Sequence, residues 1–126
     1  MPPTRTPKLA PYLAVPNARE LVRFLETALG GTLSFEESAP DGRLVHAEVR
    51  IADGLVMIGE PAPGRSFPGM IHLYVPDADR AFQDALRAGA TPVREPTVAP
   101  DGDRRGGVRD AWGNEWWFTT PPGGMS

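Results

Sequence analysis

Two histidines and a nearby glutamate are the side chains in this sequence best suited to acid–base or metal chemistry. His46 and Glu48 are two positions apart in an alternating segment, so they share one face if that segment is a strand. His72 lies two positions after Met70 and shares a strand face with it in the same way. An imidazole can be a metal ligand, a general base or a simple hydrogen-bonding group. The sequence leaves all three roles open.

Other common chemistries are excluded or disfavoured by composition. The chain has no cysteine, which removes disulfides, thiolate nucleophiles and cysteine-ligated zinc and suits a cytoplasmic location. No serine lies in a Gly-x-Ser-x-Gly turn, and no glycine-rich loop precedes a helix. A net charge of −3 argues against nucleic-acid binding. No segment approaches the ~20 apolar residues of a membrane span, and we expect neither a signal peptide nor a membrane partner.

The first half of the chain predicts one helix and four strands. Apolar residues recur at helical spacing from Ala18 to Leu29, with Asn17 as the expected N-cap and Gly30–Gly31 as the stop. The strands are expected at Pro11–Val15, Thr32–Glu37, Val45–Ile51 and Leu55–Ile58.

The second half repeats this order, and the segment 12–18 resembles the segment 72–78 at a distance of 60 positions. Asp77 is the expected cap of a helix over Ala78–Ala88. Arg104, Arg105 and Arg109 alternate with aspartates, which favours a solvated loop over a phosphate site. The expected strands are Met70–Val75, Thr91–Thr97, a strand around Gly107–Arg109, and Glu115–Thr120.

The repeated order, with three sequence signatures, resembles the vicinal oxygen chelate superfamily of glyoxalases, bleomycin resistance proteins and dioxygenases, most closely its PhnB-like branch. The signatures are residues 40–48 (PDGRLVHAE), 74–79 (YVPDAD) and 107–116 (GVRDAWGNEW). The resemblance implies an α+β fold in a single domain, 1–126, with βαβββ modules at 10–60 and 69–120. It also implies a curved mixed sheet around a cleft, and a homodimer.

Metal-dependent members of that superfamily take His or Glu ligands from the first and last strands of each module. The positions that match here are Ala10, Ile58 (or Met57), Met70 and Trp117. None carries an imidazole or carboxylate, the donors that such metals need. We therefore predict no metal and no cofactor.

Strand alternation then predicts a cleft lined by aromatic and thioether side chains. Leu13, Val15, Ile71, Leu73, Val75, Trp116 and Phe118 would pack under the helices, leaving the opposite strand faces for a ligand. Glu115 is a candidate carboxylate there, although its place beside a turn favours solvent exposure. The predicted ligand-binding residues are Tyr12, His46, Glu48, Met57, Met70, His72, Tyr74, Glu115 and Trp117.

These features favour a metal-independent protein that binds or sequesters an aromatic or hydrophobic small molecule, such as an antibiotic. The alternative is a metal-dependent glyoxalase-like lyase, isomerase or dioxygenase with a relocated metal near His46, Glu48 and His72. Each aromatic residue could instead belong to the core or to a dimer interface.

Overall fold

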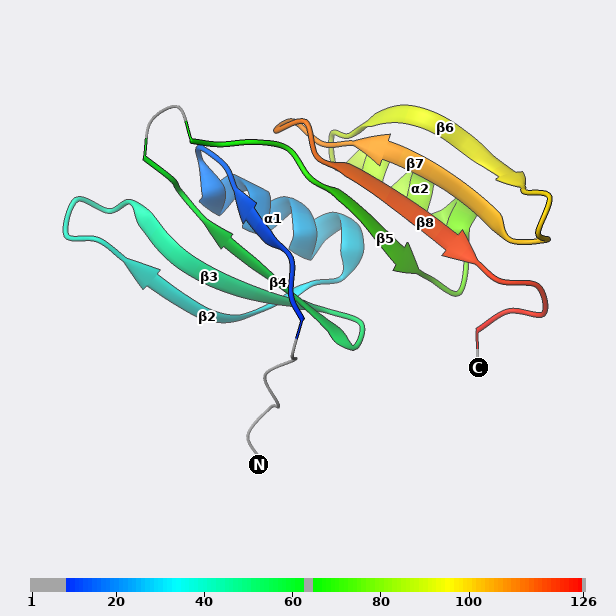
Figure 1. Cartoon of the computed structure of the whole chain (residues 1–126), viewed down its shortest axis with the longest axis horizontal. Coiled ribbons are helices and arrows are strands. Elements are labelled where there is room, and N and C mark those ends of the chain that lie inside the picture. The colour runs from blue at the N-terminus through cyan, green and yellow to red at the C-terminus, as the bar shows by residue number, and fades with distance from the viewer. Residues whose placement is uncertain (1–8, 63–64, 126) are drawn as a thin grey trace. The chain divides into compact units, whose positions relative to one another are not determined.

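The computed structural model describes residues 9–62 and 65–125, which form two βαβββ modules (Figure 1). The first module comprises β1 (Tyr12–Ala14), α1 (Ala18–Leu29), β2 (Thr32–Ser38), β3 (Leu44–Ile51) and β4 (Gly54–Gly59). The second comprises β5 (Met70–Tyr74), α2 (Ala78–Arg87), β6 (Thr91–Val98), β7 (Arg104–Arg109) and β8 (Glu115–Thr120). The predicted α+β fold of two βαβββ modules is confirmed.

Each module has one four-stranded mixed sheet with the same strand order. The order is β1-β4-β3-β2 in the first and β5-β8-β7-β6 in the second. The first strand pairs parallel with the last, and the other pairings are antiparallel. Because the two helices begin at Ala18 and Ala78, the structure keeps the 60-residue offset of the sequence repeat.

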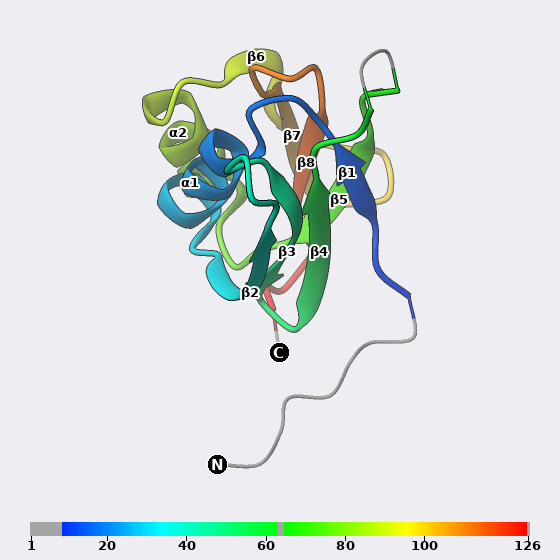
Figure 2. The ribbon, with the colours of Figure 1, turned by 90° about the vertical axis from the view of Figure 1, so that its left-hand side faces the viewer.

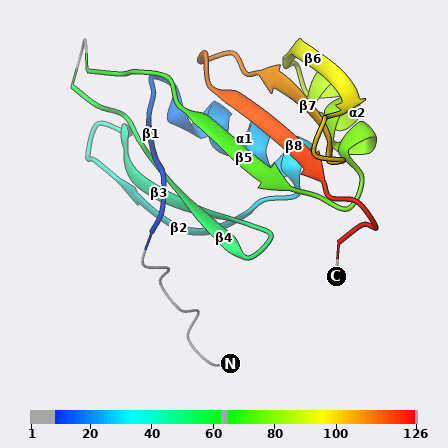
Figure 3. The ribbon, with the colours of Figure 1, turned by 45° about the vertical axis from the view of Figure 1, so that its right-hand side comes forward.

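One helix covers one face of each sheet. The alternating residues Ala47, Val49 and Ile51 of β3 are buried, and the Val49 side chain lies against Gly31 at the end of α1. Figure 2 shows α1 on one side of β2, β3 and β4. In the second module, α2 lies against the sheet, as Figure 3 shows, and the core holds Trp116 and Phe118. Among the described residues, no helix of the same module covers the opposite face of each sheet, and we call that face the open face.

Two local expectations are wrong. Asn17 makes no side-chain cap hydrogen bond, because its backbone is left-handed at φ 53° and ψ 48°. Asp77 has extended backbone, and its carboxylate accepts a hydrogen bond from the Arg80 amide as predicted. The expected loop around Arg104 and Arg105 is instead the start of β7.

Within the part of the chain described, no helix is long and apolar enough to cross a bilayer.

Candidate functional site

All nine predicted ligand-binding residues lie on the open faces. Residues opposite each other in a ladder project to the same side of the sheet, so the strand register assigns each face. Tyr12, His46, Glu48 and Met57 belong to the open face of the first module. Met70, His72, Tyr74, Glu115 and Trp117 belong to that of the second.

In the first module, one register row crosses all four strands. Phe35 of β2 lies opposite Glu48 of β3, Glu48 opposite Met57 of β4, and Met57 opposite Tyr12 of β1. We call these four residues the first row. Its two ends are exposed aromatic rings, and its centre is a thioether and a carboxylate.

His46 lies between the two aromatic ends of the first row. Its ring centroid is 5.9 Å from that of Tyr12, with planes 28° apart, and 5.9 Å from that of Phe35. Tyr12 reaches this position across β4 because Gly59 has no side chain. A Cβ at Gly59 would collide with the Tyr12 hydroxyl and would lie 2.6 Å from the Val45 carbonyl oxygen. Gly59 therefore permits a continuous set of three rings.

The polar part of this face is a histidine–glutamate pair. Nε2 of His46 lies 3.1 Å from Oε2 of Glu48, and about a quarter of each side chain is exposed, 24% and 26%. A carboxylate at this distance orients the imidazole ring by accepting a hydrogen bond from it. The pair can hydrogen-bond a polar group of a ligand or take up a proton from it.

The second module carries the equivalent row with different residues. Arg94 of β6 lies opposite Gly107 of β7, Gly107 opposite Trp117 of β8, and Trp117 opposite His72 of β5. We call these four residues the second row. The Trp117 indole lies flat on the Gly107 backbone, because a Cβ there would come within 2.7–2.8 Å of three indole atoms. The His72 ring is nearly parallel to the indole, at 15° and 6.3 Å between centroids.

Glu115 fixes the indole in place instead of projecting freely into solvent. Its Oε1 accepts a hydrogen bond from Nε1 of Trp117 at 3.1 Å, and its Oε2 pairs with Arg109 at 2.9 Å. The Arg109 guanidinium, followed by the indole N–H, lowers the pKa of the Glu115 carboxyl. The expectation that solvent exposure would dominate at Glu115 is wrong, because the side chain is 21% exposed and has two partners.

A buried carboxylate organises the β7–β8 turn beside this site. Asp110 is 5% exposed and accepts hydrogen bonds from the amides of Trp112 and Asn114, the Asn114 side chain and Nε1 of Trp116. The Asn114 side-chain oxygen in turn accepts from the Gly69 amide at 2.8 Å. The 107–116 signature thus ties the turn to the residue before β5.

The residues at the superfamily's metal-ligand positions do not fit a metal. Ile58 is fully buried on the helix side of β4, and Met70 offers only an exposed thioether. The indole N–H of Trp117 is already donated to Glu115. Across the described residues, no three His, Asp or Glu side chains gather as a metal site would require. The residues at these positions therefore supply no set of ligands that could hold a metal.

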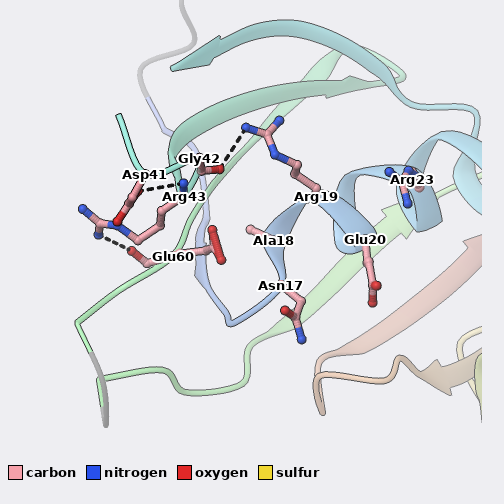
Figure 4. Close-up of a pocket in the computed structure, with 9 residues that line it drawn as sticks. All are labelled: Asn17, Ala18, Arg19, Glu20, Arg23, Asp41, Gly42, Arg43 and Glu60. Carbon is pink, nitrogen blue, oxygen red and sulfur yellow. Dashed lines mark hydrogen bonds between the residues drawn. The ribbon is translucent and has the colours of Figure 1, made fainter. Parts of the chain in front are cut away.

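A separate hollow of about 470 Å³ lies at the start of α1 (Figure 4). Three guanidinium groups and three carboxylates line it, so its formal charges balance. Arg19 points to the β2–β3 turn, where it bonds the Gly42 carbonyl, and Arg43 bonds the Glu60 carbonyl. The lining is Asn17, Ala18, Arg19, Glu20, Arg23, Asp41, Gly42, Arg43 and Glu60, none of them a predicted ligand-binding residue.

Four residues of the open faces were missed from sequence: Phe35, Gly59, Arg94 and Gly107. β2 and β6 each have two register irregularities, which break the alternation that would have assigned Phe35 and Arg94 to a face. A glycine inside a strand signals close approach of another group. In the structure Gly107 lies inside β7 and Gly59 ends β4, whereas the strands expected from sequence began at Gly107 and ended at Ile58.

Comparison with known proteins places this chain in a family. A sequence model of the Glyoxalase/Bleomycin resistance protein/Dioxygenase superfamily matches residues 8–118. The chain belongs to this superfamily. It is 36% identical over 127 residues to an uncharacterised protein of Mycobacterium bovis, a match that covers 91% of this chain and 84% of the relative.

Solved structures share the fold. TioX from Micromonospora sp. ML1 is 29% identical, with a TM-score of 0.77 over 90% of this chain and 98% of that one. TnmS3, an antibiotic binding protein from Streptomyces sp. CB03234, is 17% identical, with a TM-score of 0.74 over 93% and 97%. The similarity to TnmS3 shows the fold alone.

Proposed function

We propose that this protein binds a flat aromatic or hydrophobic small molecule on its open faces, without a metal. The observation that carries the proposal is the alignment of rings that remain accessible: Tyr12 is 47% exposed and Phe35 49%, and both flank His46. Accessible aromatic groups gathered on one face are typical of a binding site. Stacking contributes about 0.5–1.5 kcal/mol per ring pair beyond the burial of area.

The half-buried Trp117 of the second row supports the same function. Gly107 supports one side of the indole, and the hydrogen bond to Glu115 fixes its rotation. A ring held in place before binding loses little conformational entropy when a ligand stacks on it. Antibiotics with planar aromatic groups are the first ligands to test, since an antibiotic binding protein shares this fold.

Calorimetric titration with quinoline, 1,4-naphthoquinone and bleomycin tests the proposal. Trp117→Ala and Tyr12→Ala remove one ring from each module, and we expect a loss of affinity of about tenfold from at least one of them. Val98→Ala is the control, because Val98 is exposed but lies opposite Arg104, on the helix side of its sheet. Binding that is unchanged in both aromatic variants would contradict the proposal.

Catalysis is tested in the same samples. The His46–Glu48 pair, at 3.1 Å on the open face, favours proton transfer as a second candidate function. Chemical change of the added compound, followed by chromatography and abolished in His46→Gln, would favour turnover over capture. Stoichiometric zinc, nickel, manganese or iron in protein purified without chelator would contradict metal independence.

A further inference from the structure

The two register rows differ most at their outer ends. Phe35 ends the first row on β2, and Arg94 ends the second row on β6. The strand order makes these positions equivalent. The second module therefore has a cation where the first has an apolar ring.

Most other charges around Trp117 are already paired. Both carboxylate oxygens of Glu115 are used, one by Arg109 and one by the indole. Arg105 pairs with Asp101 at 2.6 Å and lies 3.6 Å from Asp103. These two guanidinium groups and three carboxylates therefore engage one another, with one negative charge in excess.

Arg94 is the exception. Within residues 9–62 and 65–125, no carboxylate lies within 4.0 Å of its guanidinium, and the side chain is exposed. Arg94 lies directly opposite Gly107, whose backbone supports the indole. Opposite residues of an antiparallel pair project to the same side of the sheet, so the Arg94 side chain starts on the face that carries Trp117 and next to the backbone that supports the indole. His72 lies beside the indole on its other neighbouring strand, β5.

We propose that the second module selects aromatic ligands that carry an anionic group, such as a carboxylate. The aromatic ring stacks on Trp117, and its acid group pairs with Arg94. A guanidinium matches a carboxylate in a two-pronged hydrogen-bonded geometry. This inference rests on the proposed binding function and adds the chemical class of the ligand.

Two probes of the same shape, one negatively charged and one neutral, test the inference. Naphthalene-2-carboxylate and naphthalene-2-carboxamide are titrated by calorimetry at low ionic strength. We expect the carboxylate to bind about fivefold more tightly, which is the upper range for an exposed ion pair. Added salt should lower the affinity for the carboxylate probe alone, because it screens the ion pair with Arg94.

Arg94→Gln should lower the affinity for the carboxylate about fivefold and leave that for the amide unchanged. Arg94→Lys should retain part of the preference, since it keeps the charge but not the planar fork. Arg23→Gln is the matched control, because Arg23 is an exposed arginine of α1 in the first module. Circular dichroism confirms that each variant is folded.

The outcomes separate the two proposals. Equal binding of both probes, or an equal effect of Arg94→Gln on both, would overturn the inference and leave the binding function standing. Failure of both probes to bind, together with no effect of Trp117→Ala on the other test compounds, would overturn the binding function itself.

Discussion

At the scale of single residues, Asp110 illustrates how one buried carboxylate organises the turn beside the candidate site. Its oxygens accept four hydrogen bonds, two from backbone amides and two from side chains. Asp110→Ala leaves these donors without their partner in a buried region. We expect a loss of about 3 kcal/mol in the free energy of unfolding, measured with urea.

Asp53→Ala is the control for that measurement. Asp53 is exposed in the β3–β4 turn, and its substitution should cost less than about 1 kcal/mol. Equal losses in the two variants would show that the hydrogen bonds of Asp110 contribute little net stability.

Gly107 provides a second test at residue scale. A Cβ at this position would come within 2.7–2.8 Å of the Trp117 indole, so Gly107→Ala must displace the ring. We expect a loss of about 1–3 kcal/mol in stability and a changed near-ultraviolet circular dichroism signal. Gly54→Ala is the matched strand control, because its nearest neighbour would be the Ile51 carbonyl oxygen at 3.5 Å. An unchanged tryptophan signal in Gly107→Ala would contradict the flat packing.

At the scale of elements, the two helices begin differently although the sequence repeat aligns their caps. Asp77 bonds the Arg80 amide, so Asp77→Ala should cost about 1 kcal/mol. Asn17 makes no such bond and has φ 53°, a conformation that glycine adopts without strain. Asn17→Gly should therefore be neutral or slightly stabilising in thermal unfolding. A clear loss of stability would show that the Asn17 side chain contributes in another way.

The Asp79–Arg104 pair joins the first turn of α2 to β7 and makes stability depend on pH. Arg104 donates two hydrogen bonds, at 2.6 and 2.9 Å, and these lower the pKa of Asp79 below 3.8. A carboxyl whose pKa is lower in the folded state stabilises the protein above its ordinary pKa. That contribution is lost as the pH falls through the folded-state pKa.

Asp79→Asn should therefore reduce the loss of stability between pH 5 and pH 2, as measured by urea unfolding at each pH. The side chain is 54% exposed, so the effect should be under about 1 kcal/mol. Asp53→Asn serves as the control. Identical pH profiles for Asp79→Asn and the unmodified protein would exclude a role for the pair.

The sequence predicted the elements better than the contacts within the site. Apolar periodicity fixed α1 at Ala18–Leu29, and alternation assigned Tyr12 and Trp117 to the open faces. Alternation was lost at the irregularities of β2 and β6, so Phe35 and Arg94 were missed. The partners of Glu115 could be assigned only from the structure, because Arg109 is on another strand.

At the scale of the whole molecule, the duplicated modules keep one topology but present different chemistry. The first open face centres on His46 between two rings, and the second on an indole beside an arginine. Mutation of one face should therefore change selectivity without abolishing the fold. The titration stoichiometry shows how many ligands one chain binds.

We expect the chain to form a homodimer, and its mass in solution tests this directly. Large apolar side chains remain exposed on the single chain, among them Phe67 at 66% and Met70 at 63%. Burial of such groups against a second copy would contribute about 25 cal/mol per Å² of apolar area. We expect sedimentation equilibrium at micromolar concentration to give twice the chain mass of 13.6 kDa. Phe67→Ser and Met70→Ser should weaken the dimer, with Val98→Ser as an equally exposed control. A mass of one chain at all concentrations up to about 100 μM would contradict the expected homodimer.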